Sequence, residues 1–285
     1  MSDFPEVDSH FHVWSVSEFE YDFLKVEECK ILYRNISVEE YDDNRRKTPI
    51  KYSIFVQCLN KCIAETEIII KEAERHTFIK GVVAGLDITN GNLRQEIERL
   101  RSQSKLLVGI RHILDDEEES WLTREDVHCG LKILEEENLT FDLLLRPNLI
   151  KYAQELPKKF PKLKMVVDHM AKPNIKDKEI EEWKSDIEKI GKYSNVYCKI
   201  SGLVTEADWD NWKESDFEPY IKHILDTFGL ERCMFGSDWP VCRLAKADYK
   251  DVYNLYKNIL RKYLNDSEVT LIMGRNAIQF YGLSL

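Results

Sequence analysis

The stretch Val7-Asp8-Ser9-His10-Phe11-His12-Val13-Trp14 stands near the start of the 285-residue chain and has the pattern of a short β-strand. Side chains at positions i and i+2 of a strand point to the same side, so His10 and His12 are expected to face one point in space. Two imidazoles held in this way can bind a metal ion or donate hydrogen bonds to a developing oxyanion. A His-x-His pair alone is a weak indication, so its meaning depends on the partners that the rest of the chain brings to it.

Further apolar segments follow this stretch and alternate with amphipathic ones. The apolar segments are predicted as strands at 52–58, 79–87, 106–112, 141–146, 164–169, 196–202 and 233–238. The amphipathic segments are predicted as helices at 61–76, 92–103, 124–138, 150–160 with a break near Pro157, 177–192, 217–228, 248–263 and 268–281, and residues 15–51 as a long, partly helical excursion.

Strands that are apolar along their whole length are typical of parallel sheets covered on both faces. Eight such strands with helices between them predict the α/β class, as a single (β/α)8 TIM barrel spanning residues 1–285. An open, doubly wound sheet is the alternative. No Gly-x-Gly-x-x-Gly follows the first strand, so the sequence gives no support for a dinucleotide site.

The composition limits which classes of binding partner and which cellular compartment are expected for the protein. The net charge of -10 argues against nucleic acids and anionic membrane surfaces, both of which attract basic proteins. No apolar run has the length of a membrane span, and the first residues lack the pattern of a signal peptide. The seven cysteines are scattered without a Cys-x-x-Cys, which predicts buried free thiols in a reducing compartment. We therefore expect a cytoplasmic protein acting on a small molecule.

Polar residues gather where the predicted strands end. Active sites of TIM barrels lie at the C-terminal ends of the strands, so polar groups there are expected to share one rim. His10 and His12 end the first strand, His169 the sixth and Asp238 the eighth. These four residues are predicted to form one catalytic site.

Other residues are candidates for substrate binding. Arg111 offers a fork of donors to a carboxylate or to sugar hydroxyls, with a salt bridge as the alternative. His112 has the opposite strand parity, so only one of the two can face the barrel lumen. The remaining candidates are Gln57, Lys172, Trp14 and Trp239, the two tryptophans as platforms for sugar C–H groups or as packing residues.

Several motifs resemble those of the amidohydrolase superfamily, and in particular its lactonase branch, which includes L-fuconolactonase and 2-pyrone-4,6-dicarboxylate lactonase. They are DSHFHVW at 8–14, VVDHMAKP at 166–173, FGSDWPV at 235–241 and IMGRNAIQFYGL at 272–283. The resemblance implies a metal-dependent-hydrolase-like barrel that opens a small cyclic ester. It also implies that Asp238 activates water, while His10, His12 and His169 surround a metal or the substrate carbonyl.

The sequence also departs from that superfamily. Many metal-dependent members carry a Lys or Glu on strand four and a His on strand five, whereas here these strands end in Arg111-His112 and Leu145-Arg146. The bridging ligand of a two-metal centre is therefore expected to be absent. This leaves either no required cofactor or one divalent metal, Zn²⁺ or Mn²⁺, on His10, His12, His169 and Asp238.

Three functions remain open at this point. The first is a hydrolase opening a sugar-acid lactone, with the chain's acidity favouring a neutral sugar lactone over a dicarboxylate that would need Arg111, Arg146 or Arg243. The second is a metal-dependent amidohydrolase or decarboxylase on the same barrel. The third is a barrel that binds a metabolite without catalysis.

Overall fold

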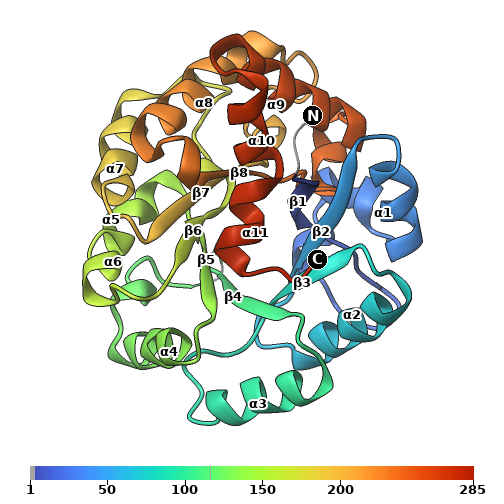
Figure 1. Cartoon of the computed structure of the whole chain (residues 1–285), viewed down its shortest axis with the longest axis vertical. Helices are drawn as coiled ribbons and strands as arrows, with labels where there is room; N and C mark the ends of the chain where they lie inside the picture. Colours follow the sequence, from blue (N-terminus) through green and yellow to red (C-terminus); the bar gives the residue numbers. More distant parts are fainter. Residues whose placement is uncertain (1–3, 116) are drawn as a thin grey trace.

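The computed structural model describes residues 4–115 and 117–285 and confirms the predicted (β/α)8 barrel (Figure 1). Eight parallel strands follow one another in chain order. They are β1 (Glu6–Phe11), β2 (Ile50–Val56), β3 (Ile79–Ala84), β4 (Leu107–Ile113), β5 (Thr140–Leu144), β6 (Met165–Val167), β7 (Val196–Ile200) and β8 (Cys233–Phe235). The barrel closes between β8 and β1, where Phe11 pairs with Trp239 and the His12 amide donates to the Trp239 carbonyl over 2.8 Å.

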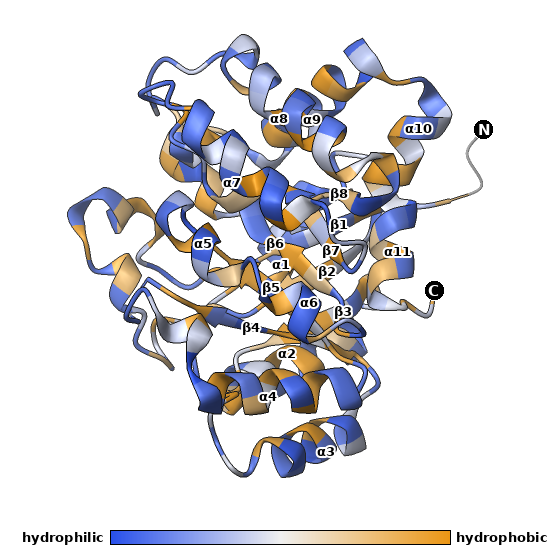
Figure 2. Ribbon diagram, turned by 90° about the vertical axis from the view of Figure 1, so that its left-hand side faces the viewer, coloured by the Kyte–Doolittle hydropathy of each residue, from blue (hydrophilic) through white to orange (hydrophobic). Residues whose placement is uncertain are grey.

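The helices lie outside the strands, most of them in a ring with their apolar faces toward the strands (Figure 2). They are α1 (Val38–Arg45), α2 (Ile63–Arg75), α3 (Leu93–Gln103), α4 (Glu125–Glu136), α5 (Ile150–Ala153), α6 (Leu156–Lys159), α7 (Glu181–Gly191), α8 (Glu214–Phe228), α9 (Tyr249–Tyr263), α10 (Asp266–Thr270) and α11 (Asn276–Tyr281). In α9 the buried Val252, Tyr256, Ile259 and Leu260 recur at helical spacing, which gives this helix one apolar face.

The barrel interior is layered. At the N-terminal ends of the strands lies an apolar layer, in which Val7, Ile54, Val166 and Met234 are fully buried. The helix α11 covers this end and adds Phe280 and Tyr281 to the layer (Figure 1). Polar side chains occupy the middle of the barrel and its C-terminal mouth, so the interior is a filled core rather than a pore.

The structure shortens several predicted elements. The first strand ends at Phe11, and β6 and β8 have three residues each, so His12, His169 and Asp238 lie on the turns that follow strands. Polar side chains at strand ends favour turns over continued sheet, which explains the early ends. The predicted helix 150–160 breaks between α5 and α6, just before Pro157, and the predicted helix 268–281 consists of α10, a π-helical turn at Leu271–Arg275, and α11.

The cysteines agree with the prediction in one respect and differ in another. All seven are free thiols. Four of them are buried, namely Cys58, Cys198, Cys233 and Cys242. Cys129 is exposed because it lies off the buried face of α4, which corrects the expectation that the thiols are buried. Among the described residues, no helix combines the length and apolar character needed to cross a bilayer.

Candidate active site

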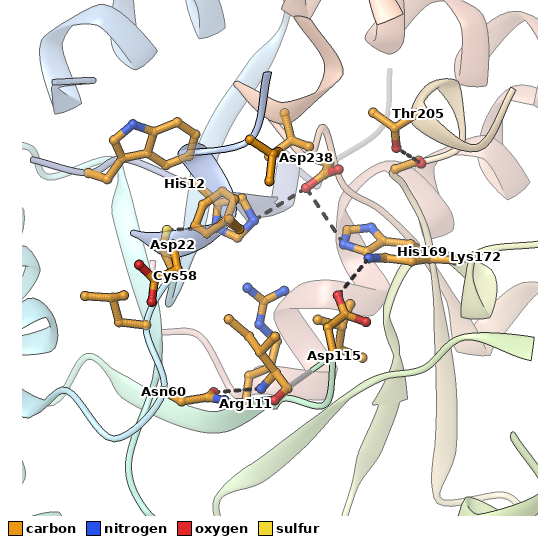
Figure 3. A pocket seen from close by; sticks show the side chains of 18 of the residues that line it. His12, Asp22, Cys58, Asn60, Arg111, Asp115, His169, Lys172, Thr205 and Asp238 are labelled. Atoms are coloured by element: carbon orange, nitrogen blue, oxygen red, sulfur yellow. Dashed lines mark hydrogen bonds and ion pairs between the residues drawn. The ribbon is translucent and has the colours of Figure 1, made fainter. Parts of the chain in front are cut away.

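A pocket of about 500 Å³ opens at the C-terminal ends of the strands (Figure 3). His12, Arg111, His169 and Asp238 line its deep, polar part and are each at most 5% exposed. The rest of it is lined by apolar groups, which are Trp14, Phe23, Val26, Leu59, Ile113, Leu144 and Val241, and by polar or charged groups, which include Glu20, Asp22, Asn60, Asp115, Lys172 and Thr205. Phe23 and Val26 come from the excursion after β1, so that excursion forms one side of the pocket.

The four residues predicted as catalytic converge, with His12, His169 and Asp238 lining the bottom of this pocket and His10 fully buried next to them. One oxygen of Asp238 (Oδ1) lies 3.4 Å from His12 Nε2, 3.8 Å from His169 Nε2 and 3.9 Å from His10 Nε2. The two imidazoles of the His-x-His pair also meet, with 3.1 Å between their Nε2 atoms. The predicted convergence of His10, His12, His169 and Asp238 is therefore present in the structure.

An irregularity in β1 aims His10 into the barrel. The pairing of β1 with β2 shifts register between Asp8 and Phe11. Asp8 consequently points outward, where its carboxylate accepts hydrogen bonds from Tyr41, Tyr249 and the Ser237 hydroxyl and amide. These bonds tie β1 to the turn after β8 and so fix His10 relative to Asp238.

A left-handed turn carries His169. Residues 169–172 all have positive φ angles between 48° and 60°, although none of them is glycine. L-residues rarely adopt this conformation, and a run of four stores strain of the kind found at functional sites. The turn brings both His169 and Lys172 to the pocket, and Ser201 Oγ holds His169 Nδ1 over 2.9 Å.

Beneath the pocket lies a charged layer that is almost fully buried. Lys199 Nζ contacts Asp142 Oδ2 over 2.5 Å and Asp168 Oδ1 over 3.0 Å. Arg111 Nη1 contacts Asp168 Oδ2 over 3.2 Å, and Arg111 Nη2 donates to the Gln57 carbonyl over 2.5 Å. Two cations and two carboxylates thus compensate one another inside the barrel, as buried charges must.

Burial and neighbouring charges decide which of these groups are ionised. Burial alone would raise the pKa of Asp238, but His169, His12 and His10 outweigh it and hold that pKa below its usual range. Burial lowers the pKa of His169 to about 4, and burial together with Lys199 lowers the pKa of His10 well below its usual value. At neutral pH, Asp238 is therefore a carboxylate, and both His10 and His169 are neutral.

The donor set fits one divalent cation. His12 Nδ1 lies 2.8 Å from the Val56 carbonyl, which can only accept, so neutral His12 carries its hydrogen on Nδ1 and a lone pair on Nε2. That lone pair faces the carboxylate of Asp238 and the Nε2 of His10. Ligand atoms of His10, His12 and Asp238 all lie within 4.8 Å of one another. Imidazole and carboxylate are ligands that Zn²⁺ accepts, and three protein ligands leave a position open for water or substrate.

The structure decides which of Arg111 and His112 faces the lumen. Arg111 points into the barrel toward His10 and Asp168. His112 points outward, stacks on Trp121 with 4.1 Å between ring centroids, and contacts Glu117 over 2.8 Å.

The predicted substrate-binding residues divide into two groups. Trp14 and Lys172 line the pocket with Arg111. Gln57 and Trp239 are fully buried and are not among the residues that line it. Gln57 donates hydrogen bonds to the Asn60 side chain and to the Arg111 carbonyl, and Trp239 packs on Tyr41. In the structure both residues therefore contact other protein groups that surround the pocket.

Several residues in and around the site were not predicted from the sequence, among them Asn60, Glu65 and Asp8. Asn60 lines the pocket and exchanges two hydrogen bonds with the backbone of Ile113, which joins the loop after β2 to β4. The buried Glu65 accepts the amides of Cys58 and Leu59. Asp8 orders the turn after β8. Its position next to the His-x-His pair is the one signal that could have identified it.

A (β/α)8 barrel with three histidines around a carboxylate at its C-terminal mouth defines a hydrolase-type site that can hold one metal ion. The sequence model of the amidohydrolase family (Amidohydrolase) matches residues 7–283, so the chain belongs to this family. The predicted resemblance, and with it the prediction of a hydrolase, is thereby confirmed.

Several relatives resemble the chain over nearly its whole length. It is 27% identical to the L-fucono-1,5-lactonase of Burkholderia ambifaria, covering 96% of this chain and 94% of the relative. It is 22% identical to the L-rhamnono-gamma-lactonase of Scheffersomyces stipitis, covering 86% and 88%. The crystal structure of an amidohydrolase from Burkholderia multivorans with bound zinc superposes with a TM-score of 0.93 at 27% identity, covering 98% of this chain and 100% of that one.

Proposed function

We propose that the protein hydrolyses the lactone of a sugar acid, with Asp238 as the base that activates water. The observation that carries this proposal is the convergence of three imidazole nitrogens on one oxygen of Asp238, within 3.9 Å, at the bottom of the pocket. The lactonase names of the Burkholderia ambifaria and Scheffersomyces stipitis relatives support the same reaction.

Asp238 would transfer one proton in each half of the reaction. The carboxylate takes a proton from water while the water oxygen bonds to the lactone carbonyl carbon. When the bond between that carbon and the ring oxygen breaks, Asp238 returns the proton to the leaving alkoxide, and the open-chain hydroxy acid results. Lys172 and Arg111 lie in the same pocket and would orient the ring through its oxygen atoms.

His10, His12 and Asp238 would hold a divalent metal ion, with His169 beside them. Such an ion polarises the substrate carbonyl and stabilises the negative charge that develops on its oxygen. The orientation of His12 supports this part of the proposal, because its Nδ1 lies 2.8 Å from the Val56 carbonyl and its Nε2 lies 3.4 Å from Asp238. A metal ion would also be consistent with the lowered pKa of Asp238. A weak base removes a proton from water more readily when a nearby cation lowers the pKa of that water.

The charges at the pocket favour a neutral sugar lactone over a dicarboxylate. Each arginine that could bind a second carboxylate already has an acidic partner: Arg111 pairs with Asp168, Arg146 with Asp115, and Arg243 with Glu40 and Asp248. The apolar wall formed by Trp14, Phe23 and Val26 suits the C–H faces of a sugar ring.

The test is to compare the purified protein with its Asp238→Asn variant on L-fucono-, L-rhamnono- and galactonolactones and on the pyrone dicarboxylate. We expect kcat/KM on a sugar lactone to fall by about 10³-fold or more, because the base is removed while its shape is kept. Asp87→Asn is the control, since Asp87 accepts its hydrogen bonds from Thr89 in its own loop. If Asp238→Asn keeps most of the activity, or no lactone is hydrolysed by the unmodified protein, the proposal is wrong.

A further inference from the structure

Lys199 places a positive charge directly behind the His-x-His pair. Its side chain is fully buried on β7, and its ammonium nitrogen lies 3.1 Å from His10 Nδ1. Asp142 and Asp168 complete the surroundings of that nitrogen at 2.5 Å and 3.0 Å. Two carboxylate oxygens and one imidazole nitrogen thus enclose the ammonium group much as they would enclose a cation from solution.

His10 is held by cations at both of its ring nitrogens. Lys199 lies at Nδ1, and Arg111 Nη1 lies 3.2 Å from Nε2. A histidine that binds a metal normally donates its other N–H to a carboxylate, which makes the imidazole a stronger ligand. Here Asp168 is the carboxylate in question, 3.5 Å from His10 Nδ1, but it is shared with Lys199 and Arg111.

We propose that Lys199 is a positioning residue that weakens divalent-cation binding at His10, His12 and Asp238, so that a bound cation remains exchangeable. Two effects act in the same direction. The ammonium group repels a second cation across the imidazole of His10, and it competes for the Asp168 carboxylate that would otherwise strengthen His10 as a ligand. The proposal rests on the cation site of the proposed function and on no particular substrate.

The main test removes the buried ion pair without changing the net charge of the interior. In the double variant Lys199→Met with Asp142→Asn, one positive and one negative charge disappear together. Methionine fills the space of the lysine stem, and the amide that replaces the Asp142 carboxylate keeps a hydrogen-bonding group opposite the Tyr281 hydroxyl, which lies 3.0 Å from Asp142 Oδ2. Zinc is titrated calorimetrically into chelator-stripped protein, and Co²⁺ absorption reports the ligand set.

We expect the double variant to bind zinc about tenfold more tightly than the unmodified protein, with one ion per chain in both. The matched control removes the buried ion pair of α1 as Arg45→Met with Asp42→Asn, which lies away from the pocket and should leave zinc affinity unchanged. Equal or weaker zinc binding by the double variant overturns the proposal and leaves Lys199 a structural role. No zinc binding by the unmodified protein overturns the cation site itself, a separate result.

A second variant tests the same proposal if the double variant does not fold. Asp142→Asn alone removes a carboxylate partner of Lys199 and leaves the ammonium charge less compensated, so zinc binding should weaken by about threefold or more. Asp142 contacts Lys199 and Tyr281 rather than the pocket, so this variant does not disturb the ligands directly. Unchanged or tighter zinc binding in Asp142→Asn would overturn the proposal.

Discussion

Replacing Gly202 with alanine tests whether the position of His169 matters to the reaction. Gly202 follows β7 and has a φ of +64°, which L-residues rarely adopt. A Cβ atom at this position would lie 2.5 Å from His169 Nδ1 and 2.6 Å from its Cγ, whereas ordinary contacts begin at 3.4 Å. The imidazole would have to retreat by about 1 Å and leave its hydrogen bond to Ser201.

The two effects of Gly202→Ala can be given magnitudes. The left-handed conformation of an alanine costs about 1–2 kcal/mol, and the lost hydrogen bond costs about 1 kcal/mol, so the free energy of unfolding should fall by about 2–3 kcal/mol. A misplacement of about 1 Å in an active site lowers the rate by about 10²-fold. We therefore expect kcat/KM for the sugar lactone to fall by about that factor in protein that is still folded at 25 °C.

Gly282→Ala is the matched control for this experiment. Gly282 also has a φ of +64°, but a Cβ atom there meets no atom within 4 Å. It should lose stability through the same backbone strain and keep full activity. Urea unfolding and lactone hydrolysis are measured on both variants. Two results would refute the claim that the reaction depends on the position of the His169 imidazole. One is activity of Gly202→Ala within threefold of the unmodified protein, and the other is an equal loss of activity in Gly282→Ala.

Three further predictions address the fold, the cation and the pocket wall. Burial raises the pKa of Glu65 from 4.5 to about 7, so the folded state binds this proton more tightly, and the free energy of unfolding should fall by about 3 kcal/mol as pH rises from 4.5 to 7. Glu65→Gln should flatten this dependence in urea titrations at pH 5 and pH 8, and an unchanged slope would contradict it. Treatment with a chelator should abolish lactone hydrolysis and added zinc should restore it; full activity in stripped protein would exclude a required metal. Phe23→Ala should raise KM several-fold with kcat little changed, because Phe23 is part of the pocket wall and 41% exposed. A decrease in kcat with KM unchanged would contradict a role of Phe23 in substrate binding.

The fold was predictable because its signal is local. Each strand is an apolar run bounded by polar residues, and parallel strands buried on both faces need only that pattern. The ends of the strands were less predictable. Residues such as His169 and Asp238 follow apolar runs directly, and only the structure shows that the chain turns at these positions, with φ angles of +53° and +54°.

The convergence of the candidate residues was predictable for a related reason, because strand order alone brings the ends of β1, β6 and β8 to one rim. The supporting contacts were not. The alternation of side chains along β1 would place Asp8 on the same side as His10, but the register shift between Asp8 and Phe11 reverses it. The pairing of Lys199 with Asp142 joins strands far apart in sequence, and no spacing rule reveals it.

The interior charges set Asp238 apart from the other buried carboxylates and support the proposed role for it. Asp142 has Lys199 as its cation, and Asp168 has both Lys199 and Arg111. In the described part of the chain, Asp238 has only imidazoles within 4.0 Å as possible cationic partners, and two of these, His10 and His169, are neutral at ordinary pH. Its negative charge is therefore uncompensated by any lysine or arginine, in a place that is 4% exposed. Because a buried charge without a cationic partner is costly, this position favours a divalent cation bound next to Asp238.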